Sequence, residues 1–278
     1  MTTAAITAPT VQGERHGGGV LTRARWVVSD TLTLTRRNLL AITRIPEALF
    51  FSTIQPIMFV LLFRYVFGGA IAIPGGLPYV DYLMPGIFVQ TVAFGAVSTS
   101  IGLAEDLQKG LIERFRALPM SRGAVLTGRT TADVVRNVFV VILITAVGYA
   151  VGFRIGTNVA YFLCGVLLIL FFAYSLSWGF AYIGLSAPNA ETAQVMVFPL
   201  IFPLLFASSA FVPIRYMPGW LQAFAYHQPV TQVVNAARSL MVGGVLHDAG
   251  AVDAALLWCA GLLVVLAPAA VRKYRKVA

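Results

Sequence analysis

Charged residues are scarce in this sequence of 278 residues, since Asp, Glu, Lys and Arg together make up only 11% of it. A soluble domain carries about 25%, whereas 58% of the residues here are hydrophobic. This composition excludes an ordinary soluble domain and predicts a chain embedded in a bilayer. The net charge of +9 does not indicate nucleic-acid binding, because the basic residues lie between apolar runs, where membrane orientation accounts for them.

Residues that carry chemistry are equally scarce. Cys164 and Cys259 each lie inside an apolar run and form no CxxC pair, so we interpret them as small core residues. His227 and His247, the latter followed by Asp248, lie too far apart in sequence to suggest a metal site by themselves. The sequence has no GxSxG motif, no HExxH motif and no paired carboxylates in an apolar run. We therefore expect no catalytic residues and no bound metal.

Long apolar runs, in contrast, are abundant. A hydrocarbon core of about 30 Å requires roughly 17–25 apolar residues, and six runs meet this length. The predicted spans are residues 48–68, 83–104, 134–153, 159–185, 192–214 and 251–271. The expected fold is an all-α membrane protein with six transmembrane helices in a single domain over 23–278. Residues 1–22, which lack the apolar run of a signal peptide, are expected to form a disordered cytoplasmic tail.

The distribution of lysine and arginine predicts the orientation of the spans. With both termini inside, sixteen of the twenty basic residues fall on the cytoplasmic side. The four on the outer side are Arg64, Arg154, Arg215 and Arg238. We therefore expect a multi-pass protein of the plasma membrane with cytoplasmic termini.

Neither ATP nor an ion gradient has an evident site in the sequence. None of the three lysines lies in a GxxxxGK[ST] motif, so a phosphate-binding P-loop is absent. Ion-coupled carriers usually place ionisable residues in mid-membrane, but the second, fourth and fifth predicted spans carry no charge. Arg136 follows Asp133 by three residues, which indicates an interfacial ion pair at a helix start more than a transport site. The energy for any transport is therefore expected to come from another chain.

Two segments outside the spans have an amphipathic pattern. In residues 105–122, Leu107, Leu111, Phe115 and Leu118 fall on one helical face, and Pro119 ends the pattern. This cytoplasmic segment is either a solvated loop or a docking element for a soluble partner. A basic amphipathic segment from 23 to 44 is expected to lie in the membrane interface.

The outer segment 215–250 predicts two short helices. Trp220 belongs to the apolar stripe of the first helix, Pro229 is placed to begin the second, and Gly243 and Gly244 are placed to end it. The pair either dips back into the outer leaflet or lies on the surface.

Polar and aromatic residues inside the predicted spans are candidates for lining a translocation path. Proline kinks in the first and fifth spans would suit such a path. The candidates are Gln55, Phe59, Gln90, Thr99, Phe202 and Ser208. The alternative is that these residues make contacts between helices or face lipid.

Three stretches carry a resemblance to a known family. They are residues 113–122 (ERFRALPMSR), residues 211–213 (FVP) with 217–221 (MPGWL), and residues 228–231 (QPVT) followed by Ala237 and Arg238. Together with the order of the segments, they resemble the type-2 permeases of ATP-binding-cassette (ABC) exporters, most closely the daunorubicin-resistance branch. The resemblance covers about residues 24–275.

The resemblance implies a permease that pairs with a second permease chain and two copies of a cytoplasmic ATPase, which would bind the ATP and Mg. It implies that residues 105–118 form a coupling helix and that Arg36, Arg37 and Arg44 belong to a connecting helix. The coupling residues would be Lys109, Leu111, Glu113, Arg114, Phe115, Arg116, Leu118 and Pro119. In the outer re-entrant segment, the matching residues are Trp220, Gln228, Pro229 and Arg238.

The function expected from the resemblance is outward transport of a hydrophobic or amphipathic compound, such as a drug, a lipid or a lipid-linked glycan. One alternative is a secondary carrier driven by an ion gradient. Another is a membrane-embedded transferase that uses His227, His247 or Asp248.

Overall fold

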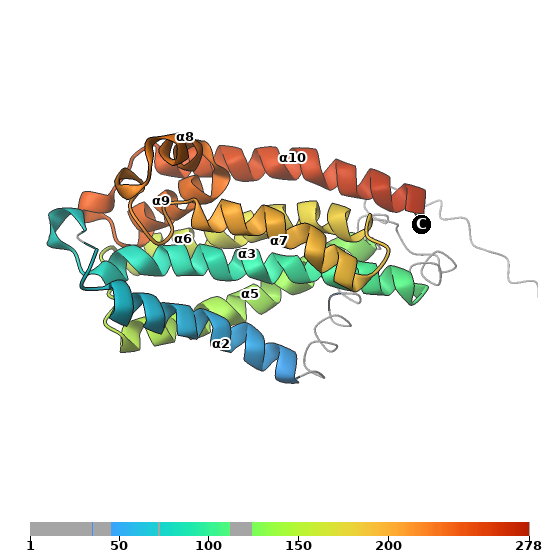
Figure 1. Cartoon of the computed structure of the whole chain (residues 1–278), viewed down its shortest axis with the longest axis horizontal. Coiled ribbons are helices and arrows are strands. Elements are labelled where there is room, and N and C mark those ends of the chain that lie inside the picture. Colours follow the sequence, from blue (N-terminus) through green and yellow to red (C-terminus); the bar gives the residue numbers. More distant parts are fainter. Residues whose placement is uncertain (1–34, 36–45, 72, 112–123, 278) are drawn as a thin grey trace, which may run out of the picture.

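The computed structural model describes residue 35 and residues 46–71, 73–111 and 124–277, and these residues are almost entirely helical (Figure 1). The expected all-α class is confirmed for this part of the chain. Its α-helices are α2 (Pro46–Leu62), α3 (Tyr79–Gln108), α5 (Ala124–Ala150), α6 (Val159–Gly184), α7 (Ala190–Phe206), α8 (Gly219–His227), α9 (Pro229–Met241) and α10 (Ala251–Val277). One turn of π-helix, Phe63–Phe67, continues α2.

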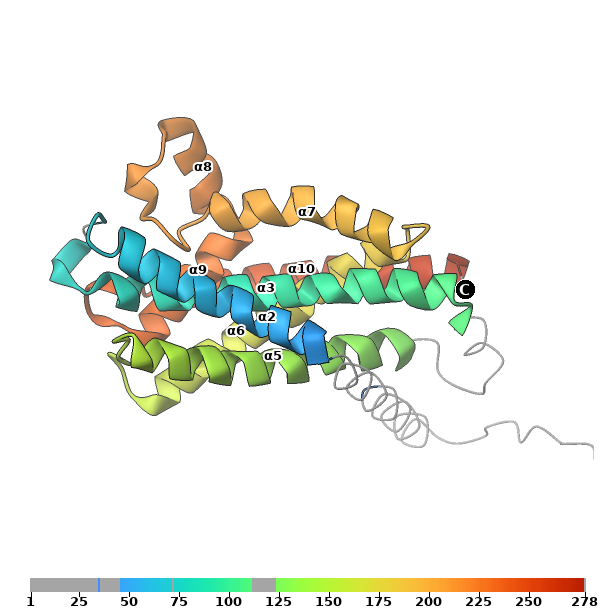
Figure 2. The ribbon, with the colours of Figure 1, turned by 60° about the horizontal axis from the view of Figure 1, so that its bottom comes forward.

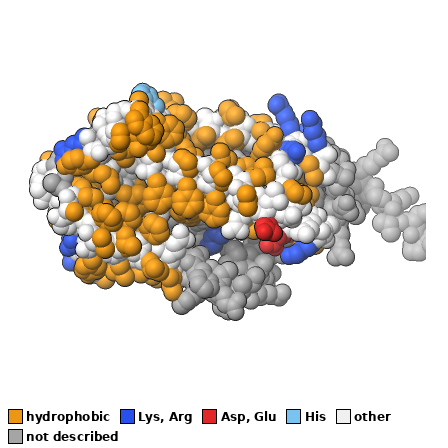
Figure 3. All heavy atoms as spheres, viewed as in Figure 1, with side chains coloured by type: hydrophobic (Ala, Val, Ile, Leu, Met, Phe, Trp, Pro, Cys, Tyr) orange, Lys and Arg blue, Asp and Glu red, His pale blue; other side chains and the backbone are white. Residues whose placement is uncertain are grey.

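Four of these helices are long and apolar enough to cross a membrane, namely α3, α5, α6 and α10. Helices α2 and α7 are apolar but shorter. Apolar side chains predominate on the face shown in Figure 3, and the basic side chains lie mainly near its ends. This distribution fits a multi-pass protein, because charged side chains are costly in the hydrocarbon region.

Helix α3 is the central helix of the bundle. It packs against α2, α5, α6, α7 and α9, and Figure 2 shows it between α5 and α7. Of its apolar stretch, 78% is buried, against 17% for α10. Small residues permit this close packing: a Cβ at Gly86 would overlap the Ala210 carbonyl oxygen, and one at Gly102 would overlap the Arg129 guanidinium.

Several helices have other bounds than the predicted membrane spans. Helix α5 begins ten residues before the predicted 134, because its early polar residues Arg129 and Asp133 bind α3 and do not form a loop. Helix α7 ends at Phe206, eight residues before 214, after Pro199 and Pro203 have each removed a backbone donor. In α10, the helix continues through the basic residues to Val277.

Residues 105–118 do not form a single helix. Helix α3 includes residues 105–108 and ends at Gln108. The chain then turns at Lys109 and Gly110, and Leu111 is again helical. Gly110 has a φ of 64°, the left-handed conformation with which glycine commonly ends helices. The sequence predicted a single helix here because the helical spacing of apolar residues at 107, 111, 115 and 118 continues across this glycine.

Much of the predicted coupling and connecting segments lies outside the described residues. This holds for Glu113, Arg114, Phe115, Arg116, Leu118 and Pro119, for Arg36, Arg37 and Arg44, and for the expected tail at 1–22. In the N-terminal region, Thr35 is buried and its hydroxyl donates to the Gly128 carbonyl oxygen at 3.1 Å. This contact places Thr35 beside the start of α5.

The two ends of the bundle differ. Gln108 at the end of α3, the start of α5 and the basic end of α10 lie at one end, which we call the inner end (Figure 1). Helices α8 and α9 lie at the opposite, outer end. The prediction of two short helices in 215–250 is confirmed, with α9 beginning at Pro229.

The contact at Gly86 generates a stability prediction. Gly86→Val should force α3 away from the Ala210 backbone and lower the stability by about 1–3 kcal/mol or more. The measurement is the thermal unfolding temperature of the detergent-purified protein. Gly261→Val is the control, because a Cβ at Gly261 in α10 would meet nothing within 4 Å. Equal unfolding temperatures for both variants would contradict the close packing of α3.

Candidate functional site

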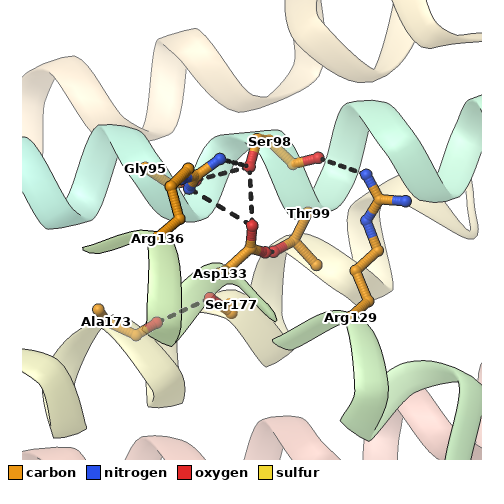
Figure 4. A network of polar contacts seen from close by, with 8 residues as sticks. All are labelled: Gly95, Ser98, Thr99, Arg129, Asp133, Arg136, Ala173 and Ser177. Carbon is orange, nitrogen blue, oxygen red and sulfur yellow. Dashed lines mark hydrogen bonds and ion pairs between the residues drawn. The ribbon is translucent and has the colours of Figure 1, made fainter. Parts of the chain in front are cut away.

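The inner half of the α3–α5 interface contains a buried polar network centred on Asp133 (Figure 4). The Asp133 side chain, only 4% of whose residue surface is exposed, accepts hydrogen bonds from the hydroxyls of Ser98 and Thr99 on α3. Arg136, one turn further along α5, forms an ion pair with Asp133 at 3.4 Å. The predicted Asp133–Arg136 ion pair is therefore confirmed, but it is buried between two helices.

Two arginines of α5, Arg136 and Arg129, bind α3 directly. Arg136 donates to the Ser98 hydroxyl at 2.6 Å and to the Gly95 carbonyl oxygen. Arg129 pairs with Asp106 at 3.2 Å and donates to the Ser98 carbonyl oxygen at 3.3 Å. Two acids thus balance two bases, so the network is formally neutral.

A buried ion pair contributes little net stability, but removing one partner leaves an uncompensated charge that is costly. Such a network therefore fixes the relative position of the two helices. Helices α3 and α5 are also the two that flank residues 109–123.

At the outer end, residues 207–213 leave helical geometry after α7 and expose backbone carbonyls. Four side chains bind these carbonyls. The Tyr82 hydroxyl donates to the Ser209 oxygen at 2.9 Å, the Tyr79 hydroxyl donates to the Phe211 oxygen at 2.9 Å, and the Gln228 amide donates to the Ala207 oxygen. The fourth is Arg238. Non-helical backbone within a membrane protein requires such internal partners.

Arg238 is the most strongly bound side chain of this group, and only 3% of its surface is exposed. Its guanidinium donates to the carbonyl oxygens of Ser209 at 2.6 Å, Ala210 at 3.0 Å and Tyr82 at 2.9 Å. It also donates to the Ser209 hydroxyl and the Asn235 amide oxygen, and it lies 3.5 Å from the centre of the Tyr82 ring. Burial lowers the pKa of the guanidinium, and the nearby Tyr82 and Tyr79 oppose this shift.

A cavity of about 310 Å³ adjoins this site and opens to the surface. Tyr82, Ser209, Asn235 and Arg238 form one part of its lining, and Arg215, His247 and Asp248 are among the others. His247 Nδ1 lies 2.8 Å from the Ser239 hydroxyl oxygen. Among the described residues, no group of three His, Cys, Asp or Glu side chains is arranged to hold a metal ion.

The six candidate path-lining residues do not gather at one place. Gln90, Thr99 and Ser208 are buried, and the Thr99 hydroxyl is bound to Asp133. Gln55 is exposed on α2, and Phe202 is 44% exposed on α7. Phe59 is half-buried. Whether any of them lines a path stays a prediction.

A row of stacked phenylalanines connects α2 to α7. The Phe63 ring stacks on Phe211 at 4.6 Å, Phe211 on Phe206 at 5.3 Å, and Phe206 on Phe202 at 5.6 Å. Phe59 extends the row at its α2 end, with its ring 5.9 Å from that of Phe63. The spacing of four residues between phenylalanines in both helices was a visible signal in the sequence, but the bridging role of Phe211 was not.

In the outer segment, the structure separates the four singled-out residues. Gln228 and Arg238 are buried and bind the 207–211 backbone, Pro229 begins α9, and Trp220 on α8 is 77% exposed. Sequence reasoning missed Tyr79 and Tyr82, which precede Arg238 by more than 150 residues. A partial signal for this site was present in the stretches that carry the family resemblance. The FVP and QPVT stretches and Arg238 lie in the segments that meet here.

The model of the ABC-2 type transporter family matches residues 29–242 of the sequence. The daunorubicin resistance ABC transporter permease protein of Streptomyces coeruleorubidus is 36% identical over 250 residues, which cover 89% of this chain and 87% of the relative. The chain belongs to the ABC-2 type transporter family. The doxorubicin resistance ABC transporter permease protein of Mycobacterium tuberculosis is 27% identical over 192 residues, covering 67% of this chain and 66% of the relative.

As an ABC-2 permease, the chain is a transport subunit and not itself a catalyst. The ATPase of such a transporter is separate. The resemblance noted on the 113–122, 211–221 and 228–238 stretches is therefore confirmed at the family level.

The inner network generates a second stability prediction. Asp133→Asn should leave Arg136 buried without a counter-charge and cost about 3–5 kcal/mol, seen as a lower thermal unfolding temperature. The double variant Asp133→Asn, Arg136→Gln should recover much of the loss, because no buried charge is then left unpaired. Glu191→Gln, at an exposed acid of α7, is the control. A single variant as stable as this control would contradict the role of the ion pair.

Proposed function

We propose that this ABC-2 permease is the membrane half of an ATP-driven exporter in the plasma membrane. It crosses the membrane six times with both termini in the cytoplasm. It pairs with a second permease chain and with two copies of a cytoplasmic ATPase, which bind ATP and Mg. The observation that carries the proposal is the buried α3–α5 network, which joins the two helices that flank residues 109–123.

The lengths of the shorter helices support six spans. Helix α2 with its π-helical turn extends from Pro46 to Phe67, which at 1.5 Å per residue is about 33 Å. Helix α7 has 17 residues and is about 25 Å long, and the internally bound residues 207–213 extend it toward the outer side. Both are therefore compatible with a hydrocarbon core of about 30 Å.

The placement of basic residues supports the orientation. Arg272, Lys273, Arg275 and Lys276 lie at the end of α10, at the same end of the bundle as Gln108. Because Lys and Arg are enriched on the cytoplasmic side, this end is the cytoplasmic one. Residues 109–123 then face the ATPase, with Lys109 and Leu111 at the beginning of the coupling segment.

In this proposal, the ATPase supplies the energy by binding and hydrolysing ATP, and the permease transmits the resulting motion. Movement of residues 109–123 is passed to α3 and α5 as one unit, because Asp133, Arg136 and Arg129 hold these helices together. Helix α3 then carries the displacement to α7 and the outer end, since it packs against both.

We propose a hydrophobic or amphipathic compound as the substrate, such as a drug, a lipid or a lipid-linked glycan, and outward movement as its direction. The relatives named for daunorubicin and doxorubicin resistance support a drug within this class. The partly exposed phenylalanine row between α2 and α7 offers apolar ring faces to such a compound.

The coupling segment generates a prediction about assembly. Changing Glu113, Arg114 and Phe115 together to alanine should abolish co-purification with the partner ATPase, and with it the stimulation of ATP hydrolysis. Changing Arg215, Tyr216 and Asp253 to alanine is the control, since these residues offer a base, an aromatic ring and an acid at the outer end, all exposed. Normal assembly and stimulated hydrolysis in the coupling variant would contradict docking through this segment.

A transport assay distinguishes the exporter from an ion-driven carrier. In liposomes, the complex of permease and ATPase should move substrate only when ATP is supplied, and a protonophore should have no effect. Transport by the permease chain alone, abolished by the protonophore, would overturn the proposal in favour of the secondary carrier.

A further inference from the structure

Residues 207–211 are held in place from two sides. Tyr79 and Tyr82 reach them from α3, and Gln228 and Arg238 reach them from the outer segment. We call these four side chains and the carbonyls they bind the outer latch. In addition, the Ser209 amide donates to the Thr231 hydroxyl at 3.2 Å, and the Ser209 hydroxyl donates to the Asn235 amide oxygen at 2.8 Å. The latch joins the outer ends of α3, α7 and α9.

The acceptors around Arg238 are all neutral. Its guanidinium donates to three carbonyl oxygens, one hydroxyl and one amide oxygen, and it forms no ion pair with a carboxylate among the described residues. Each of these hydrogen bonds is strengthened by the charge of the donor, but none has a charged acceptor. The latch therefore holds the charge through neutral dipoles and the face of the Tyr82 ring, and water can replace the dipoles.

The adjoining cavity provides that water. Ser209, Asn235 and Arg238 all contribute to its lining, and it opens to the surface at the outer end. When the guanidinium leaves the carbonyls, it can enter an aqueous space and avoids the hydrocarbon region, where a bare charge is costly. Asp248 lines the same cavity. Arg238 thus has two environments that can solvate it.

Movement of residues 207–211 would also disrupt the phenylalanine row. Phe211 lies at the end of this segment and stacks on both Phe63 of the π-helical turn and Phe206 of α7. While the latch is closed, Phe211 bridges α2 and α7. Displacement of the segment removes this bridge and separates the two outer ends.

We propose that Arg238 is a positioning residue for export, which closes the outer end of the permease in this conformation and releases residues 207–211 when substrate leaves. The inference rests on the proposed export function and names the step that the outer end performs. Release transfers the guanidinium from the backbone carbonyls to the cavity and moves Phe211 out of the row.

A reversible cross-link tests the proposal. In a chain with Cys164→Ser and Cys259→Ala, the changes Ser209→Cys and Asn235→Cys place two thiols where the native side chains are in contact. The variant is co-reconstituted with its ATPase in liposomes. Oxidation should lower ATP-dependent export about tenfold or more, because opening then becomes the limiting step, and a reductant should restore it. The two single-cysteine variants, treated alike, are the controls. Equal export by the oxidised and reduced double variant would overturn the latch.

The same experiment separates the latch from the proposed function. If the unmodified permease neither assembles with the ATPase nor exports in an ATP-dependent way, the proposed function fails. If it exports normally and the disulfide has no effect, the exporter stands and the latch alone is wrong.

A labelling measurement keeps the proposal falsifiable if the double variant does not fold or does not oxidise. In the Ser209→Cys variant of the chain with Cys164→Ser and Cys259→Ala, a membrane-impermeant maleimide added outside should react slowly without ATP, because residue 209 is buried, and faster during turnover. Adding Arg238→Lys, which keeps the charge but loses the planar five-donor group, should make labelling fast even without ATP. Adding Arg215→Lys, at the exposed arginine of the same cavity, should not. Labelling rates unaffected by both turnover and Arg238→Lys would overturn the proposal.

Discussion

A chain that leaves helical geometry between the spans of a membrane protein must find partners for its backbone groups within the protein. Residues 207–213 meet this constraint through Arg238, whose five donors are all used, together with Tyr79, Tyr82 and Gln228. The outer architecture depends on these contacts. They require a break in α7, an α9 that presents Arg238 to the bundle, and Gly86 in α3, where any side chain would overlap the Ala210 backbone.

The inner end of α3 is bound in a different way. There, Arg129 of α5 forms an ion pair with Asp106 of α3, and the Asp133–Arg136 pair of α5 binds polar groups of α3. The outer end is instead bound to α7 and α9 through neutral dipoles and a tyrosine ring around a single charge. This difference gives the same helix a firm inner connection and an exchangeable outer one. A transporter driven from the cytoplasmic side needs both connections. The applied motion must be transmitted fully to α3 at its inner end, and it must still change the contacts at the outer end.

Local signals in the sequence were sufficient for some elements and misleading for others. The start of α9 followed from Pro229, whose effect acts within a few residues. The early start of α5 was missed because Arg129 and Asp133 look like loop residues until their partners on α3 are known. Gly110 ends a helix that the apolar spacing of residues 107–118 predicts to continue, because its backbone adopts the left-handed conformation. The Tyr82–Arg238 contact joins residues 156 apart, and no periodicity within one segment can reveal it.

The central claim is that α3 moves rigidly with α5 at the inner end and separates from the outer segment when ATP binds. Spin labels at Gln108 and Val135 report the first distance, and labels at Pro78 and Tyr216 report the second, all four positions being exposed. Pulsed electron paramagnetic resonance on the reconstituted complex measures both with and without ATP. We predict an unchanged distribution for Gln108–Val135 and a longer one for Pro78–Tyr216 during turnover. A fixed outer distance together with a changed inner one would contradict this account.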